Sequence, residues 1–388
     1  MQIIVHRGTH QIGGCCTEIA TANTRILVDF GMPLPESRQE SLELVGVTSG
    51  KARCDGILIT HYHSDHIGEI NNVLPNVPIY IGESTKEIVA AYKQHMREHF
   101  YVDMSLNNVR PIQGGVPFTI GDMKITPIIS DHSSFQSYMF LIEAEGKRVL
   151  HTGDFRLHGP YRDAIMKQLE DIRGVDLVIT EGTTLNRSGE IWTEERVKSV
   201  FSQLMNRYKY CFLLTSSSNL DRISQFAQAI ERGRYFLVDE FQNRLLEIVK
   251  KYDIDSQMYM KKAVTYGNNI KQRFEKRGFG MVVRVTPGFE KIIRYYMTNH
   301  GEETCLIYSM WTGYKEANNI KKFLEVVGEK VYVVHSSGHV ALQDLNLMLN
   351  MLDPKRILFI HTENHPDDIS IDIRERIVEL EDGRELKI

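Results

Sequence analysis

Short apolar segments that end in polar residues recur along the first part of the chain. They lie at 25–30, 55–60, 123–129, 147–151 and 175–180. Segments of this length, bounded by glycine, proline or charged residues, are typical of buried strands. Histidine, aspartate or glutamate stands at or near the end of each one. Because loops at one edge of a sheet often build a site, the pattern predicts strands that carry functional side chains at their ends.

The pattern changes at about residue 190 to an alternation of strands and helices. Apolar strands are predicted at 210–214 and 234–238, and helices at 221–231 and 241–252. An earlier helix is expected to begin after Thr193, whose hydroxyl can cap it. Such an alternation predicts a parallel sheet covered by helices.

The first pattern returns at about residue 330, where strands end at His335 and His361. A chain of 388 residues is too long for one ordinary core, so two domains are expected. We predict a catalytic domain formed by residues 1–184 and 330–388. An inserted domain of residues 185–329 interrupts it.

The composition indicates a globular protein of a reducing compartment. Hydrophobic residues make up 42% of the chain, and no apolar run is long enough for a transmembrane helix. The N-terminus enters a strand pattern without the charged head and apolar segment of a signal peptide. The five cysteines show no CxxC spacing, which favours buried thiols over disulfides, ligands or redox groups. We therefore expect a cytoplasmic location without membrane attachment.

Basic residues are concentrated in one segment, although the formal net charge is only −4. Between residues 261 and 294 they are Lys261, Lys262, Lys271, Arg273, Lys276, Arg277, Arg284, Lys291 and Arg294. The acidic residues of this segment are Glu275 and Glu290. The segment is compatible with a solvated helical face or with a groove that follows phosphate groups.

The run His61-Tyr62-His63-Ser64-Asp65-His66 places four candidate metal ligands within six residues. It follows a short apolar strand and precedes a more helix-like stretch, so it is predicted to form a strand-to-helix loop. In an extended segment, His61, His63 and Asp65 share one side, because side chains alternate. His66 points elsewhere as the chain turns. Two ligands can therefore face one metal and two a second.

Other strand ends supply the ligands that this run lacks. His61, His63 and His132 are predicted to form one site, and Asp65, His66 and His361 a second, with Asp154 as the bridge. Each ion needs about three protein ligands and a position for water. Two ions can share a hydroxide. Imidazole and carboxylate ligands suit two divalent ions, with zinc favoured and manganese as the alternative.

The run HYHSDHIG, with Asp29 before it and the motifs SDHS, TGDF and IHTE after it, resembles the metallo-β-lactamase fold family. The resemblance covers about 1–182 and 330–388. It implies an αββα sandwich of two mixed sheets, with helices outside and metals at one edge. It also implies that Asp29 lies behind the metal loops and orients them.

The inserted segment resembles the β-CASP nucleases. Thr215-Ser216-Ser217-Ser218-Asn219-Leu220-Asp221-Arg222 is similar to their F-x-S-N-x-x-R stretch, and residues 335–339 to their H-x-S-G-H motif. Glu181 matches the acidic residue of a further motif. His361 matches the histidine variant of the ribonuclease J-like branch. The fold class implied is α/β (α+β): a metallo-β-lactamase sandwich interrupted by a β-CASP-like α/β domain.

This resemblance implies roles for further residues. The implied catalytic residues are Asp65, Asp154, Glu181 and His339, and the implied phosphate-binding residues are Ser218, Asn219, Ser337, Gly338 and His339. His335 either supports its motif or packs in the core. The sequence departs from full ribonuclease J in two respects. The extra C-terminal domain is not expected, and Gly13-Gly14-Cys15-Cys16-Thr17-Glu18-Ile19 keeps only part of that family's N-terminal glycine loop.

These features favour a two-metal phosphodiester hydrolase that is specific for single strands, with RNA favoured over DNA. A metal-bridging hydroxide would attack phosphorus while His339 and the Ser218 region hold the phosphate. The alternatives are a small-molecule hydrolase (a lactonase, thioesterase or phosphodiesterase) and a non-catalytic scaffold that binds RNA or a partner. The inserted domain favours the nuclease, because a small substrate does not require a second domain. Trp311 is either interface core or a platform for a base, and a homo-oligomer stays open.

Overall fold

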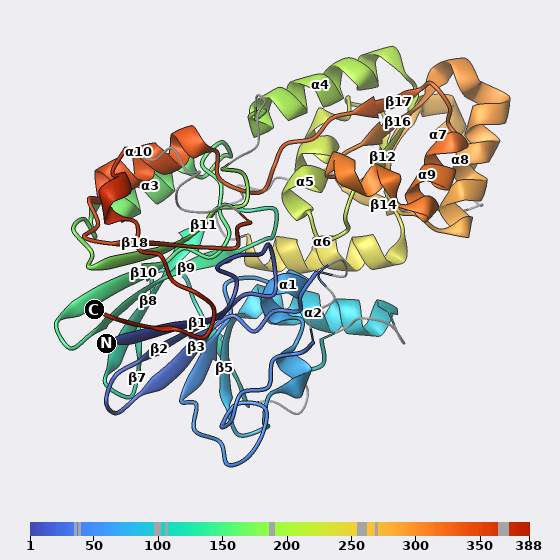
Figure 1. Ribbon diagram of the computed structural model, residues 1–388. Helices are drawn as coiled ribbons and strands as arrows, with labels where there is room; N and C mark the ends of the chain where they lie inside the picture. The colour runs from blue at the N-terminus through green and yellow to red at the C-terminus, as the bar shows by residue number, and fades with distance from the viewer. Residues whose placement is uncertain are drawn as a thin grey trace. The chain divides into compact units, whose positions relative to one another are not determined.

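The computed structural model describes residues 1–34, 37, 40–96, 102–104, 108–185, 191–253, 262–267, 271–363 and 372–388 (Figure 1). The chain forms two compact units. The first consists of Met1–Gly189 and Gly338–Ile388, and the second of Glu190–Ser337.

The first unit contains two mixed sheets in its described part. The first sheet has the strand order β19 (Glu385–Lys387), β1 (Gln2–Arg7), β2 (Cys16–Ala20), β3 (Arg25–Val28), β4 (Gly56–Leu58), β5 (Pro78–Gly82) and β6 (Asn108–Ile112). The second has the order β18 (Ile357–Ile360), β11 (Leu177–Glu181), β10 (Lys147–His151), β9 (Ser137–Ala144), β8 (Met123–Ser130) and β7 (Phe118–Ile120). Each sheet pairs parallel strands on one side and antiparallel strands on the other.

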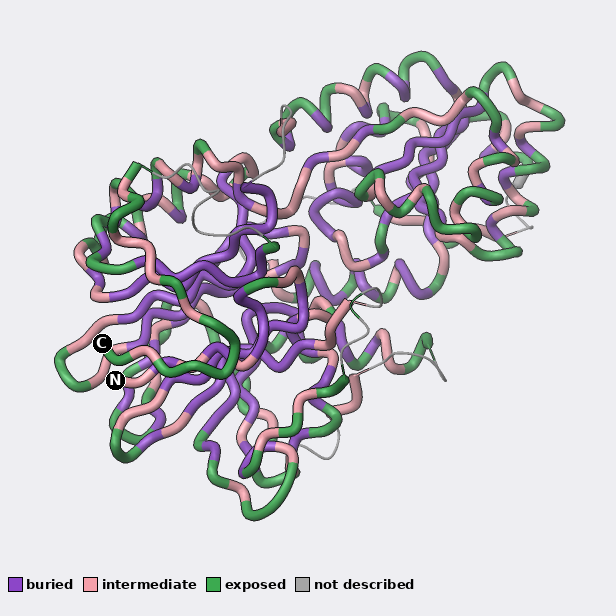
Figure 2. Tube along the Cα trace, in the orientation of Figure 1, coloured by how far each residue is buried: buried purple, intermediate pink, exposed green. Residues whose placement is uncertain are grey.

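The two sheets face each other across a shared apolar core. Val5 and Leu58 of the first sheet pack in one cluster with Phe140 and Ile179 of the second, and all four are fully buried. The helices of this unit are α1 (Ser64–Ile67), α2 (Glu83–Met96), α3 (Arg162–Glu170) and α10 (Leu342–Leu352), with short 3₁₀ turns η2 (Ile70–Asn72) and η7 (Arg374–Arg376). A second core cluster joins α3 and α10 to the second sheet. This sheet is therefore covered on both faces, which explains why β11 is buried along its whole length. In Figure 2, the strands in the interior of this unit are mostly buried (purple).

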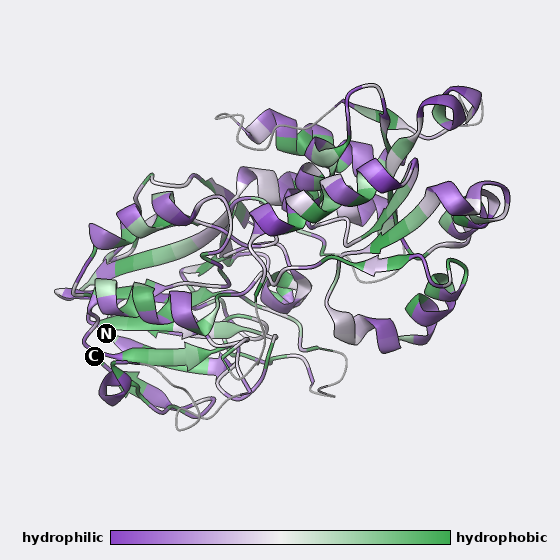
Figure 3. Cartoon of the chain, turned by 90° about the horizontal axis from the view of Figure 1, so that it is seen from above, coloured by the Kyte–Doolittle hydropathy of each residue, from purple (hydrophilic) through white to green (hydrophobic). Residues whose placement is uncertain are grey.

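The second unit is a parallel sheet with helices around it. The strand order is β14 (Ala263–Thr265), β13 (Tyr235–Val238), β15 (Phe279–Val283), β12 (Tyr210–Leu214), β16 (Thr304–Tyr308) and β17 (Val331–Val333). The helices are α4 (Glu194–Arg207), α5 (Leu220–Ala229), α6 (Glu240–Tyr252), α7 (Lys271–Arg277), α8 (Pro287–His300) and α9 (Asn318–Glu325), with turns η4 (Gly301–Glu303) and η5 (Thr312–Glu316). Thr193 caps α4 by accepting the Arg196 N–H. The predicted parallel sheet is confirmed, and Figure 3 shows hydrophobic strands beside helices of mixed polarity.

Residues 330–337, which the sequence-based division assigned to the catalytic domain, lie in this second unit. β17 supplies an edge strand of the parallel sheet by pairing with β16. The expected strand end at His335 therefore belongs to the second unit. Local hydrophobicity could not reveal this, because pairing partners are not encoded in the strand's own pattern.

Candidate metal centre

The loops after four strands of the first unit bring seven candidate ligands together. They come from the segment between β4 and the end of α1, and from the ends of β8, β10 and β18. The ligands form two groups. Within each group, the binding atoms lie within 4.8 Å of one another. The first group is His61, His63 and His132, and the second is Asp65, His66, Asp154 and His361. These are the groups that the sequence suggested, and their function as metal ligands stays a prediction.

The spacing within the first group suits a tetrahedral cation. His63 Nδ1 lies 3.0 Å from His61 Nε2 and 3.2 Å from His132 Nε2. Nitrogen ligands at about 2.0–2.1 Å from a tetrahedral zinc ion are about 3.3–3.4 Å apart. The three imidazoles thus need only small movements to bind one ion. Burial lowers the pKa of His61 and His132, and lowers the pKa of His63 to about 4, which favours the neutral form that binds metal.

The second group combines two imidazoles with two carboxylates. His361 Nε2 lies 3.2 Å from Asp65 Oδ2, and His66 Nε2 lies 3.2 Å from Asp154 Oδ2. The same Asp154 oxygen is 3.9 Å from His132 Nε2, which belongs to the first group. Asp154 is therefore placed between the two groups, where a bridging carboxylate would lie.

Outward hydrogen bonds fix which nitrogen of each imidazole faces the centre. His132 Nδ1 donates to the Gly338 carbonyl oxygen at 2.6 Å, and a carbonyl can only accept. His361 Nδ1 lies 2.7 Å from Thr183 Oγ1, whose own hydrogen goes to the His361 carbonyl oxygen. Both rings therefore carry their proton on Nδ1 and turn the lone pair of Nε2 inward.

Asp29 orients one imidazole of each group. Its carboxylate is fully buried and accepts from His66 Nδ1 at 2.7 Å and from Thr60 Oγ1 at 2.8 Å. Because the Thr60 hydroxyl donates to Asp29, it can accept from His61 Nδ1 at 3.0 Å. The structure thus places Asp29 behind the ligands, in contact with His66 directly and with His61 through Thr60.

The buried polar atoms of the second group fit a bound cation. Among the described residues, Asp154 Oδ1 and His66 Nε2 are buried without a hydrogen-bond partner. Burial lowers the pKa of His66, but Asp154 and other negative groups outweigh it and raise that pKa well above its ordinary value. Without an ion, the carboxylates therefore draw a proton onto His66. A divalent cation would supply this positive charge, so the donor set fits the metals of the prediction.

Glu181 and His339 form a pair beside the second group. Glu181, at the end of β11, accepts from His339 Nδ1 at 2.9 Å and from the Phe155 N–H at 3.0 Å. His339 Nδ1 is also 3.6 Å from Asp154 Oδ2, and its side chain is 22% exposed. Burial lowers the pKa of His339, but the carboxylates of Glu181 and Asp154 more than offset this and raise it to about 9. The raised pKa favours the protonated form of His339, whose side chain is partly exposed at the edge of the ligand cluster.

The residues expected to bind phosphate are divided between the two units. Gly338 and His339 belong to the first unit, whereas Ser218, Asn219 and Ser337 belong to the second. Asn219 caps α5 by accepting the Arg222 N–H, and Ser218 Oγ lies 2.7 Å from Ser216 Oγ. The Arg222 guanidinium is buried and donates to the Ser336 carbonyl oxygen at 3.3 Å, which ties these two motifs together. Phosphate binding by these residues stays a prediction.

Comparison with known proteins identifies the first part of the chain. Residues 24–210 match the family model described as "Beta-lactamase superfamily domain". This part of the chain is therefore similar to the beta-lactamase superfamily domain. A solved structure of a protein of unknown function from Enterococcus faecalis V583 has the same fold, with a TM-score of 0.79 at 16% identity over 99% of both chains. The predicted metallo-β-lactamase fold is thereby confirmed.

Curated relatives extend the similarity beyond the beta-lactamase superfamily domain. Ribonuclease J of Helicobacter pylori strain B128 is 24% identical over 98% of this chain and 60% of the relative. Ribonuclease J of Thermus thermophilus is 25% identical over 94% of this chain and 68% of the relative. The chain is thus similar to ribonuclease J over almost its whole length and spans about 60% of the first of these relatives. No helix in the described ranges is long and apolar enough to cross a membrane.

The loop that carries Asp65 and His66 packs tightly on Gly31. A Cβ atom there would lie 1.7 Å from the Asp65 carbonyl oxygen and 2.8 Å from the His66 nitrogen. Gly31→Ala should therefore displace the loop, reduce bound metal and lower the free energy of unfolding by about 1–3 kcal/mol. Denaturant unfolding and metal analysis measure both effects. The control is Gly301→Ala, where a Cβ meets nothing within 4 Å; equal behaviour of the two variants would contradict the prediction.

Sequence reasoning missed three residues that contact the ligand cluster. Thr60 and Thr183 bond to the outer nitrogens of His61 and His361, and Cys15 lies beside His66. Thr60 directly precedes His61, and Thr183 follows the Glu181 motif, so their positions gave a signal. Cys15 is far from the other ligands in sequence, and its contact appears only in the folded domain.

Proposed function

We propose that this protein is a two-metal phosphodiester hydrolase that cleaves single-stranded RNA. The observation that carries the reaction class is the pair of ligand groups around Asp154, with the protonated His339 at their edge. The RNA substrate is suggested by relatives named ribonuclease J, which align with 94% and 98% of the chain. The proposal includes two bound zinc ions, because imidazole-rich sites favour zinc, with manganese as the alternative.

The protein's own residues would bind and orient the reactants. His61, His63 and His132 would hold one ion, and Asp65, His66 and His361 the other, with Asp154 shared. Two divalent ions would supply Lewis acidity and a reactive water at neutral pH. The outward hydrogen bonds of His66, His132 and His361 engage Nδ1 of each ring and leave Nε2 as the nitrogen that would bind an ion. Asp29, Thr60 and Thr183 thus preserve the donor set.

His339 would act on the phosphate as an acid. Its Nδ1 proton is engaged by Glu181, which fixes the ring and keeps it protonated. The ring can then donate a hydrogen bond to a non-bridging oxygen or transfer its proton to the leaving oxygen. Glu181 would be a positioning residue, because its two carboxylate oxygens are occupied by His339 and by backbone N–H groups.

Features of the second unit support a nucleic-acid substrate. Ser216 and Ser218 stand before the N-terminus of α5, where hydroxyl and N–H groups favour an anion. Trp311 and Tyr314 are 48% and 52% exposed and pack edge to face, which offers aromatic rings for stacking with bases. Arg273, Lys276 and Arg277 lie on or at the end of α7, whereas Lys261 is outside the described residues. We propose that the serines before α5, the two aromatic rings and the basic residues of α7 contact the RNA chain.

The cellular location completes the proposal. All five cysteines are buried and free of disulfides, as is typical of a reducing compartment. We therefore propose that the protein acts on RNA in the cytoplasm.

Substrate comparison tests this function. End-labelled single-stranded RNA, duplex RNA and single-stranded DNA are incubated with the zinc-loaded protein, beside a lactone, a thioester and a small phosphodiester. The proposal predicts fastest cleavage of single-stranded RNA and loss of cleavage with a chelator. Turnover of a small ester alone would instead support a small-molecule hydrolase.

The cleavage rate should fall as the pH rises through the pKa of His339. The raised pKa of about 9 means that the acidic form is present at lower pH and is lost above this value. Ions bound at Asp154 would offset part of its charge, so the descending limb of kcat is expected at or below about pH 9. Glu181→Gln removes a charge that raises this pKa and should move the limb down by about one pH unit or more. Superimposable profiles would contradict this role of Glu181.

A further inference from the structure

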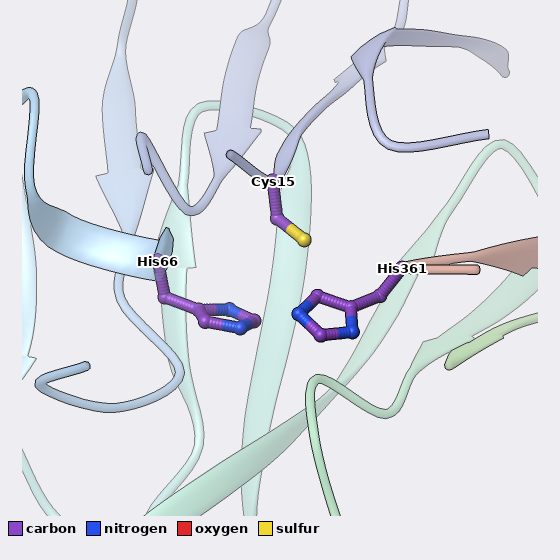
Figure 4. Close-up of side chains that lie close together, drawn as sticks. All are labelled: Cys15, His66 and His361. Carbon is purple, nitrogen blue, oxygen red and sulfur yellow. The ribbon is translucent and has the colours of Figure 1, made fainter. Parts of the chain in front are cut away.

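Cys15 lies beside two imidazoles of the second ligand group. Its Sγ and one ring nitrogen each of His66 and His361 lie within 4.8 Å of one another. Figure 4 shows the three side chains converging from separate segments of the chain. Each of these residues is 1% exposed, so the cluster is shielded from solvent.

Backbone hydrogen bonds hold Cys15 against the loop that carries Asp65 and His66. The Cys15 N–H donates to the Asp65 carbonyl oxygen at 2.9 Å, and the Cys15 carbonyl oxygen accepts from the Gly31 N–H at 2.9 Å. Cys15 is thus joined to the same two segments that position Asp65 and His66. A movement of the loop would carry the thiol with it.

The neighbouring imidazole independently indicates a ligand at this place. His66 Nδ1 donates to Asp29, so Nε2 is the ring nitrogen that faces the cluster. In the part of the chain that the structure describes, this buried Nε2 has no hydrogen-bond partner. It lies 3.2 Å from Asp154 Oδ2, so either a proton or a cation must lie between this nitrogen and the carboxylate. The nitrogen is therefore aimed at a site that needs a positive charge.

We propose that Cys15 is an additional ligand of the second metal ion and that its sulfur biases this site toward zinc over manganese. The inference rests on the proposed metal centre and extends it by one residue. Thiolate is a soft ligand that zinc accepts readily, whereas manganese prefers oxygen. On binding, the thiol would release its proton to solvent as the sulfur–metal bond forms.

Cys16 offers a matched control next to Cys15. It is also buried, but it begins β2, and within the described ranges it belongs to none of the candidate ligand groups. Side chains of adjacent extended residues point to opposite sides, so Cys16 cannot replace Cys15. A change of cysteine to serine at either position removes sulfur while nearly preserving volume.

Cobalt binding to the full chain tests the proposal. Cobalt(II) gives visible d–d bands wherever it binds in a tetrahedral or five-coordinate site, and an intense near-ultraviolet band only when sulfur is a ligand. The wild type and Cys16→Ser should show both kinds of band. Cys15→Ser should keep the visible bands and lose the near-ultraviolet band. Its zinc affinity at this site should fall about tenfold or more, with a smaller change for manganese.

Three results would overturn the inference. Wild-type visible bands without a near-ultraviolet band would mean that Cys15 is only a buried apolar side chain. An undiminished near-ultraviolet band in Cys15→Ser would assign the sulfur to another residue. Absence of all cobalt bands from the wild type would refute the metal centre itself, and Cys15 with it.

A measurement on the unmodified protein removes any dependence on how the variants fold. X-ray absorption at the zinc edge of the fully loaded wild type should detect one sulfur per two zinc ions, at about 2.3 Å. A fit that needs only nitrogen and oxygen neighbours would contradict a Cys15–zinc bond.

Discussion

Asp154→Asn is expected to abolish metal-dependent RNA cleavage, with kcat reduced on the order of 10³-fold or more. Asp154 Oδ2 lies within 4 Å of His66, His132 and His361, so it contacts both ligand groups. An asparagine nitrogen in place of this oxygen cannot bind a cation and removes the negative charge shared by the two sites. Binding of both ions should therefore weaken together.

The measurement combines single-turnover cleavage of labelled RNA with metal analysis of the purified variant. Asp163→Asn, at an exposed position of α3, is the control and should keep the wild-type rate and metal content. Unfolding by denaturant confirms that both variants are folded. A folded Asp154→Asn protein with two bound ions and an unchanged rate would contradict the assignment of Asp154 as the shared ligand.

His339→Ala is expected to reduce kcat by about 10²–10⁴-fold while leaving two ions bound. The imidazole contributes a proton that Glu181 and Asp154 maintain. Its binding atom lies within 4.8 Å of those of Asp154, Glu181 and His361, but the seven predicted ligands do not include it. The effect should therefore separate from metal loss, unlike that of Asp154→Asn. His339→Ala should also remove the alkaline limb that the wild type shows.

Metal content, kcat and the pH profile of His339→Ala are the three readouts. A control is Glu181→Gln, which keeps the His339 ring and should lose less activity while shifting the limb. If His339→Ala instead released one ion, His339 would be a metal ligand. If it cleaved RNA at the wild-type rate, its role as an acid would be refuted.

The sequence predicted two strands of the second unit, at 210–214 and 234–238, because their signal is local. Residues 210–214 form β12 as expected, since both faces of a central parallel strand are covered and its sequence is continuously apolar. Residues 331–333, which form β17, were assigned to the other domain, because their own pattern does not show which strand they pair with. These three residues are partly exposed at the edge of the sheet, and only the pairing with β16 assigns them to the second unit.

The ligand cluster shows the same division between local and long-range information. The motif around His61 contains its own ligands, and each further ligand stands at a strand end that could be identified from hydrophobicity. The tautomers could not be predicted, because they depend on Gly338, Asp29 and Thr183, which contact the imidazoles only after folding. Cys15 was interpreted as an ordinary buried thiol, since nothing in its sequence context indicates that it meets His66 and His361.

The central claim is that RNA cleavage requires two ions in this centre. The most direct test is a titration of the metal-free full chain with zinc, in which bound metal and the rate of single-stranded RNA cleavage are measured on the same samples. We predict that cleavage is absent in the metal-free protein and reaches its maximum only when two equivalents are bound. Full cleavage without metal or with one bound equivalent, or no RNA cleavage by the protein with two bound ions, would contradict the account.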